Sequence, residues 1–167
     1  MPTTPRPTVR RAAALVLGTA LALGASTAVV APASAVGGTD APGWSWETTL
    51  SGVRYSSWHG TWEVPGALGR AHADLGGGTG VLGYPVGPAE QEAPGYRFQR
   101  FERGVVYERG GTAQAVHGAV DQAHRRAGGG ATAGLGYPVT GLVTQAARYQ
   151  YQQFERGVVY TTPHLGT

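Results

Sequence analysis

Alternating and periodic hydrophobic positions divide most of the chain into hairpins and short helices. Tyr96–Phe101 and Val105–Tyr107 alternate β-forming side chains around a Glu-Arg-Gly turn, which predicts a β-hairpin. Gly104 is expected in the left-handed conformation after a type I turn, and Gly157 is expected to do the same in a later hairpin. Residues 116–127 (VHGAVDQAHRRA) follow a helical pattern that a triple glycine ends.

The same pattern recurs after about 53 residues. Two blocks repeat at this spacing: LGYPV at 82–86 and 135–139, and FERGVVY at 101–107 and 154–160. A partial copy lies upstream, where residues 65–72 resemble 117–124. We therefore predict an α+β fold of tandem repeats of about 53 residues, each a turn, a β-hairpin and a short helix.

These repeats suggest domain boundaries. Residues 1–35 precede the fold, 36–57 form an N-terminal lead-in segment, and 58–167 form the repeat domain. That domain divides into a partial unit at 58–81, a full unit at 82–134 and a partial unit at 135–167 that lacks its helix. A helix expected near the start could pack where the last helix is missing, which would close a propeller-like ring. The alternative is an open array that pairs with another chain. Trp44 and Trp46 are expected in a strand that caps the array.

Residues 1–35 have the three parts of a secretory signal peptide. Arg6, Arg10 and Arg11 make a basic start, Ala12–Ala25 is an apolar stretch, and 33–35 (ASA) is a small-residue cleavage site. We expect cleavage after residue 35 and an extracellular or wall-associated protein without stable membrane insertion. An uncleaved anchor helix is the alternative.

Charge and cysteine content exclude several functions. The chain has 13 basic and 10 acidic residues, and the excess of three lies in residues 1–35. The remainder is neutral, so we expect no nucleic-acid binding and no attraction to anionic membranes. The absence of cysteine excludes disulfides and thiolate chemistry.

We expect no catalytic site, no metal site and no cofactor. Serines lack the surroundings of a nucleophile elbow. Glu102 and Glu155 are equivalent turn residues, whereas an acid and a base need different environments. His117, Asp121 and His124 could share one helical face as metal ligands, but the upstream copy does not keep the set.

The LGYP block, the FERGVVY block and the helix that follows resemble the LGFP repeat. That family occurs in secreted and cell-wall proteins of high-GC Gram-positive bacteria, and the resemblance implies a role in holding a protein on the wall. Two features depart from the family pattern: tyrosines 84 and 137 replace its phenylalanine, and His72 and His124 stand where its helix usually carries a bulky aromatic residue.

Repeated aromatic and amide side chains suggest a binding function. We expect Gln99 opposite Tyr107 and Gln152 opposite Tyr160, so that a ring and an amide are presented twice to a repeating glycan. Tyr84 and Tyr137 are further candidates, while glutamines that only hydrogen-bond the tyrosine hydroxyls are the structural alternative.

The resulting hypothesis is a secreted, non-catalytic module that binds wall polysaccharide such as arabinogalactan or peptidoglycan. One alternative is a fragment of, or accessory to, a wall hydrolase or acyl transferase. Another is a structural protein-interaction module, for which self-association would be expected.

Overall fold

The computed structural model describes residues 36–145 and 149–162. The predicted signal peptide, residues 1–35, lies outside the described residues. Within the described ranges, no helix is both long enough and apolar enough to cross a membrane.

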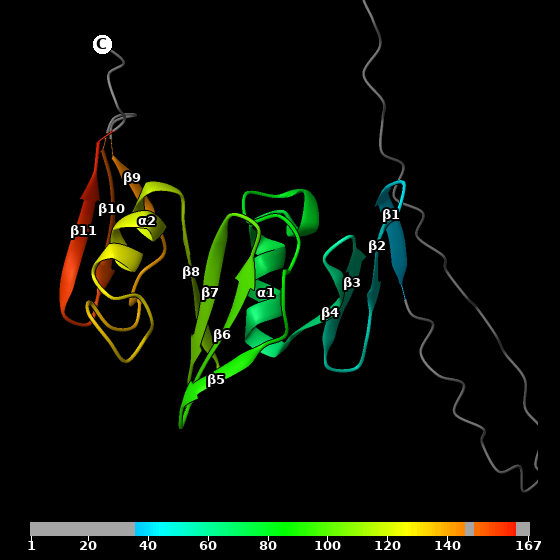
Figure 1. The fold of residues 1–167 in the computed structure, drawn as a ribbon, viewed down its shortest axis with the longest axis horizontal. Coiled ribbons are helices and arrows are strands. Elements are labelled where there is room, and N and C mark those ends of the chain that lie inside the picture. The colour runs from blue at the N-terminus through cyan, green and yellow to red at the C-terminus, as the bar shows by residue number, and fades with distance from the viewer. Residues whose placement is uncertain (1–35, 146–148, 163–167) are drawn as a thin grey trace, which may run out of the picture. The chain divides into compact units, whose positions relative to one another are not determined.

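The described strands form three antiparallel sheets, A, B and C (Figure 1). Sheet A contains β1 (Gly37–Ala41), β2 (Trp44–Thr48), β3 (Gly52–Ser57) and β4 (Gly60–Pro65). Sheet B contains β5 (Glu90–Ala93), β6 (Tyr96–Phe101), β7 (Gly104–Arg109) and β8 (Thr112–His117). Sheet C contains β9 (Val143–Gln145), β10 (Tyr149–Phe154) and β11 (Gly157–Thr161), with β10 in the middle.

Two α-helices follow the last strands of sheets A and B. Helix α1 (Gly66–Asp74) continues from β4, and α2 (Gly118–Arg126) continues from β8 and lies within the predicted 116–127. A short 3-10 helix, η1 (Gly77–Thr79), comes after α1. The described fold is therefore mostly β with two α-helices, which agrees only loosely with an α+β class.

The predicted ring is not seen in the described residues. None of the three sheets closes into a barrel or propeller, and β11 has β10 as its only neighbour among the described strands. Residues 36–57, predicted as a lead-in segment, contain β1, β2 and β3. Trp44 and Trp46 lie in β2, as expected, and both pack against the core.

Sheets A and B have the same strand order and the same register, displaced by 52 positions. Trp46 pairs with Tyr55 in sheet A, and Phe98 pairs with Tyr107 in sheet B. The irregularity between β1 and β2 recurs at the equivalent point between β5 and β6. The two sheets therefore share one strand geometry, with aromatic residues at the equivalent positions 46 and 98 and 55 and 107.

Each helix packs against two sheets. Helix α1 contacts β3 and β4 of sheet A and β7 and β8 of sheet B, around buried Leu68 and Val106. Helix α2 contacts β7 and β8 of sheet B and β11 of sheet C, around buried Val120 and Val159 (Figure 1). Both faces of sheet B are consequently covered.

The two recurrent sequence blocks contact each other. In the central unit, the Glu102 N–H donates to the Tyr84 carbonyl (3.1 Å) and the Arg103 N–H donates to the Leu82 carbonyl (3.0 Å). The next unit repeats both bonds, from residues 155 and 156 to the carbonyls of 137 and 135. The blocks recur at fixed spacing because each hairpin turn needs an LGYP segment to pair with.

The conformation predicted for the turn glycines is wrong. Gly104 and Gly157 do not have positive φ angles, and both are strand residues. A Cβ at Gly104 would lie 2.5 Å from the Val116 carbonyl oxygen and 2.9 Å from the His117 Cβ. Glycine is therefore required there by close packing against β8 rather than by backbone rotation.

The predicted cross-strand pairing is also wrong, by one residue. Gln99 pairs with Val106, and Tyr107 pairs with Phe98. Sheet C repeats this register, with Gln152 opposite Val159 and Tyr151 opposite Tyr160. A one-residue shift moves a side chain to the other face, so Gln99 and Tyr107 point away from each other. The shift arises because the turn has two residues, not three.

Candidate ligand-binding site

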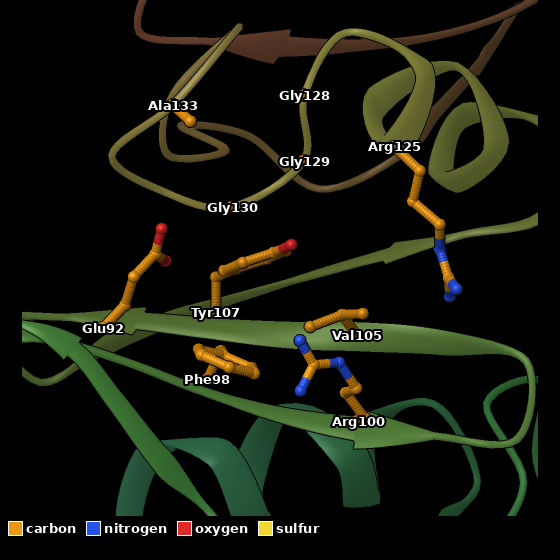
Figure 2. A pocket seen from close by; sticks show the side chains of 10 residues that line it. All are labelled: Glu92, Phe98, Arg100, Val105, Tyr107, Arg125, Gly128, Gly129, Gly130 and Ala133. Atoms are coloured by element: carbon orange, nitrogen blue, oxygen red, sulfur yellow. The ribbon is translucent and has the colours of Figure 1, made fainter.

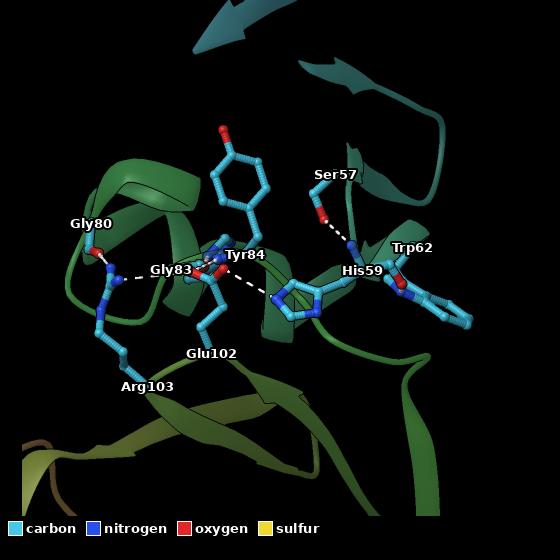
Figure 3. Close-up of polar contacts among 9 residues, drawn as sticks. Ser57, His59, Trp62, Gly80, Gly83, Tyr84, Glu102 and Arg103 are labelled. Atoms are coloured by element: carbon cyan, nitrogen blue, oxygen red, sulfur yellow. Dashed lines mark hydrogen bonds and ion pairs between the residues drawn. The ribbon is translucent and has the colours of Figure 1, made fainter. Parts of the chain in front are cut away.

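The hairpin-turn carboxylates hold the LGYP segments in place. Glu102 accepts a hydrogen bond from the Tyr84 N–H (3.2 Å), and its other oxygen lies 3.2 Å from His59 Nε2. Figure 3 shows Glu102 between His59 and Arg103. In the next unit Glu155 accepts from the Tyr137 N–H (3.3 Å). Both carboxylates thus accept a hydrogen bond from the backbone of an LGYP tyrosine.

The two predicted glutamines are buried and bind backbone. Gln99 Nε2 donates to the Glu63 carbonyl (2.9 Å) and to the Gly87 carbonyl (3.0 Å). Gln152 Nε2 makes the equivalent bonds to the carbonyls of 115 and 140, both at 2.8 Å. Neither glutamine is placed to bind a glycan, and neither bonds a tyrosine hydroxyl, so both predictions for these residues are wrong. The two glutamines instead connect each hairpin to the preceding strand and loop.

Three of the four predicted tyrosines are buried as well. The Tyr84 hydroxyl donates to Asp40, and the Tyr137 hydroxyl donates to the Thr112 carbonyl (2.7 Å). Burial raises the pKa of Tyr107 and of Tyr137 to about 12. Tyr160 is the one member of the six-residue prediction that lies open to solvent.

The helix histidines are core residues. His72 stacks on Phe101 with ring centroids 4.4 Å apart, and His124 stacks on Phe154 at 4.7 Å. The Nε2–H group of each donates to the carbonyl of the LGYP glycine, at 2.8 Å for His72 and 3.3 Å for His124. Asp121 pairs with Arg125 (2.7 Å) rather than with a histidine. Among the described residues, no group of three or more acidic, histidine or cysteine side chains is placed to hold a metal ion.

A surface pocket of about 390 Å³, which we call the central pocket, lies between sheet B and the loop that follows α2. Its lining comprises Glu92, Phe98, Arg100, Val105, Tyr107, Arg125, Gly128, Gly129, Gly130 and Ala133. Figure 2 shows the triple-glycine loop facing the strand side chains across the pocket. One cavity is thus lined by aromatic rings, a carboxylate, two guanidinium groups and glycine backbone.

A second pocket, which we call the N-terminal pocket, has a volume of about 360 Å³ and equivalent walls. Asp40, Trp46, Val53 and Tyr55 line it, together with the first triple glycine (76–78), Ala73 and Thr79. The first four positions and the glycines are displaced by 52 from those of the central pocket. The site is therefore presented twice, with a tryptophan ring in one copy and a phenylalanine ring in the other.

The carboxylate of the central pocket is held by the glycine loop. Glu92 accepts hydrogen bonds from the Ala131 N–H (2.8 Å) and from the Thr132 hydroxyl (2.8 Å). Burial favours a higher pKa for Glu92, but these bonds outweigh it and lower the pKa. Arg100 lies over the Phe98 ring, 4.6 Å from its centroid. The pocket therefore carries fixed charges of both signs beside an aromatic face.

Sequence reasoning missed these pockets. It used the triple glycines only as helix stops, although both occur at equivalent positions. The spacing of Asp40 and Glu92 from the aromatic positions after them was the signal that could have revealed the pockets.

Comparison with known families gives a match in the central unit. The model of the LGFP repeat family matches residues 82–131, and no curated protein matches the chain. The matched segment runs from the LGYP turn through sheet B and α2 to the triple-glycine loop. It includes every residue that lines the central pocket except Ala133.

Proposed function

Because residues 82–131 are an LGFP repeat, we propose that this chain is a secreted, non-catalytic module that binds cell-wall polysaccharide. The wall as target is supported by the resemblance to that family, whose members are wall-associated. The equal registers of sheets A and B support a chain built from tandem units.

The observation that carries the proposal is the repetition of one pocket at equivalent positions. Sugar rings place their C–H faces on aromatic side chains, while carboxylates and backbone groups bind their hydroxyls. Both pockets offer an aromatic ring, an acidic side chain and a glycine loop. A glycan with repeating sugars could engage both pockets, which raises its effective affinity without further contacts.

The test compares ring-removing variants inside and outside the pockets. We expect the double variant Trp46→Leu with Phe98→Leu to lose retention on purified walls by at least about tenfold, since both stacking surfaces are removed. Each single variant should keep weaker binding through the remaining pocket. Retention is measured by sedimentation with walls before and after removal of arabinogalactan.

The matched control is Trp44→Leu with Tyr96→Leu. These residues precede the pocket rings by two positions on the same strands, are also partly buried and do not line either pocket. If the control loses retention as strongly as the pocket variant, or if retention follows thermal stability in both, the pockets are not the binding site.

A further inference from the structure

One face of sheet C is rich in aromatic and apolar side chains, of which Tyr149, Val158 and Tyr160 are exposed in the described structure. The register of β9, β10 and β11 places seven residues on this face: Val143, Gln145, Tyr149, Tyr151, Gln153, Val158 and Tyr160. We call it the outer face of sheet C, and it lies opposite the face that packs on α2. We propose that the outer face of sheet C is a self-association surface, where a second copy of this chain packs the same face of its own sheet.

The equivalent face of sheet B indicates what kind of surface this is. Phe98, Val105 and Tyr107 occupy the positions that Tyr151, Val158 and Tyr160 occupy in sheet C, displaced by 53. The sheet B residues belong to the core beneath α2. The outer face of sheet C therefore keeps the side chains of a covered face, although it has no helix over it in the described residues.

Sheet A shows which side chains occupy a sheet face that is exposed to water. Glu47, Arg54 and Glu63 occupy the positions of Gln99, Val106 and Ala115, which are buried in sheet B. In sheet A these three are charged and satisfied at the surface: Arg54 donates to Glu47 (2.7 Å), and Glu63 accepts from the Thr49 hydroxyl (2.6 Å). The exposed face of sheet A carries these charged side chains and the outer face of sheet C carries none in the described residues, as expected if only the face of sheet A meets solvent.

This comparison of sheets A and C favours a second copy of the chain as the partner that packs on the outer face of sheet C. No described residue on the outer face of sheet C is charged, so two such faces do not repel each other. Stacking this face on the polar face of sheet A would bury the Arg54–Glu47 pair without compensation. A two-fold arrangement, in which equal faces pack as the two layers of a sandwich, avoids that cost.

Light scattering after size exclusion, over a range of concentrations of the full chain, tests the proposal. We expect a dimer, and we expect Val158→Glu or Tyr160→Glu to weaken it at least about a hundredfold, because the charge would be buried between the faces. Both side chains are exposed in the single chain, so the variants should fold; unchanged circular dichroism and melting check this. Every variant carries the same residues 1–35, so differences between them are due to sheet C.

Two further variants keep the result interpretable. Val81→Glu places the same charge on a valine of similar exposure outside the sheets, and it should remain dimeric. An equimolar mixture of Val158→Glu and Val158→Arg should restore dimers through opposite charges across the interface.

A wild-type chain that stays monomeric at about 100 μM, well above the μM range of standard-size interfaces, overturns the proposal. A dimer that survives Tyr160→Glu, or open assemblies larger than a dimer, also overturns it. None of these results depends on wall binding, which is measured separately.

Discussion

The second hairpin of sheet B and the hairpin of sheet C are the same structure in two environments. Tyr107 and Tyr160 occupy equivalent positions, yet they are 5% and 74% exposed. Val105 and Val158 differ in the same way, at 5% and 42%. The strand pattern alone thus does not determine burial; what packs on the strand does.

Helix α2 and the segment that follows it, including Ala131 and Tyr137, pack on the Tyr107 face of sheet B. Over sheet B, α2 places Val120 against the face that contains Tyr107. A side chain contributes to stability roughly in proportion to the apolar area it removes from water. The identical side chains Tyr107 and Tyr160 should therefore contribute unequally to the free energy of unfolding.

The largest effect is expected from truncating the two tyrosines. Tyr107→Ala should lower the free energy of unfolding by about 3–5 kcal/mol, because it empties a buried site beside His124. Tyr160→Ala should change it by less than about 0.5 kcal/mol in the monomeric state. Denaturant unfolding at low protein concentration measures both. Equal losses would show that Tyr160 is covered.

A smaller effect is expected from the two turn glycines. Gly104→Ala should cost about 2 kcal/mol, since its Cβ would meet the Val116 carbonyl and the backbone of β8 cannot move away. A Cβ at Gly157 would meet the Leu135 Cδ2 atom at 2.9 Å, and that side chain can rotate. Gly157→Ala should therefore cost less than about 1 kcal/mol. The reverse order in thermal melts would show that the strand beside β7 does not cause the requirement for glycine.

The sequence predicted the individual helices and hairpins better than the contacts between them. The position of α2, the β6–β7 hairpin and the two recurring blocks followed from hydrophobic periodicity and exact repetition. The register did not, because it depends on a two-residue turn that lets Gly104 pair with Phe101 in β6 and with His117 in β8. A tertiary contact of this kind leaves no pattern in the local amino-acid sequence.

Sequence reasoning also missed sheet A, and the reason is physical. Its strands match those of sheet B in register rather than in residue identity: Trp46 stands for Phe98, and a charged Arg54 stands for Val106. The candidate pockets were missed with it, because only the fold brings Asp40 and Glu92 into the same pockets as the glycine loops. The buried role of the glutamines likewise required knowledge of the neighbouring strand.

The smallest predicted effect concerns pH, and it arises from the helices that follow sheets A and B, since no helix follows sheet C in the described residues. Burial lowers the pKa of both His72 and His124, although the hydrogen bonds to Gly83 and Gly136 oppose it. The unfolded chain, whose histidines keep the ordinary pKa, then binds more protons than the folded chain below about pH 6.5. Stability should therefore fall as the pH decreases through this range.

The size of the pH effect is bounded by the ordinary histidine pKa. One unit below it, at pH 5.5, each buried histidine can cost at most about 1.4 kcal/mol relative to neutral pH. Replacing either with phenylalanine, which keeps the stack on Phe101 or Phe154, should remove its share of the pH dependence. The change lowers stability at every pH because a glycine carbonyl loses its donor, so the slope between pH 7.5 and 5.5 is the readout. A double variant His72→Phe with His124→Phe that keeps the wild-type slope would place the acid sensitivity in groups other than the helix histidines.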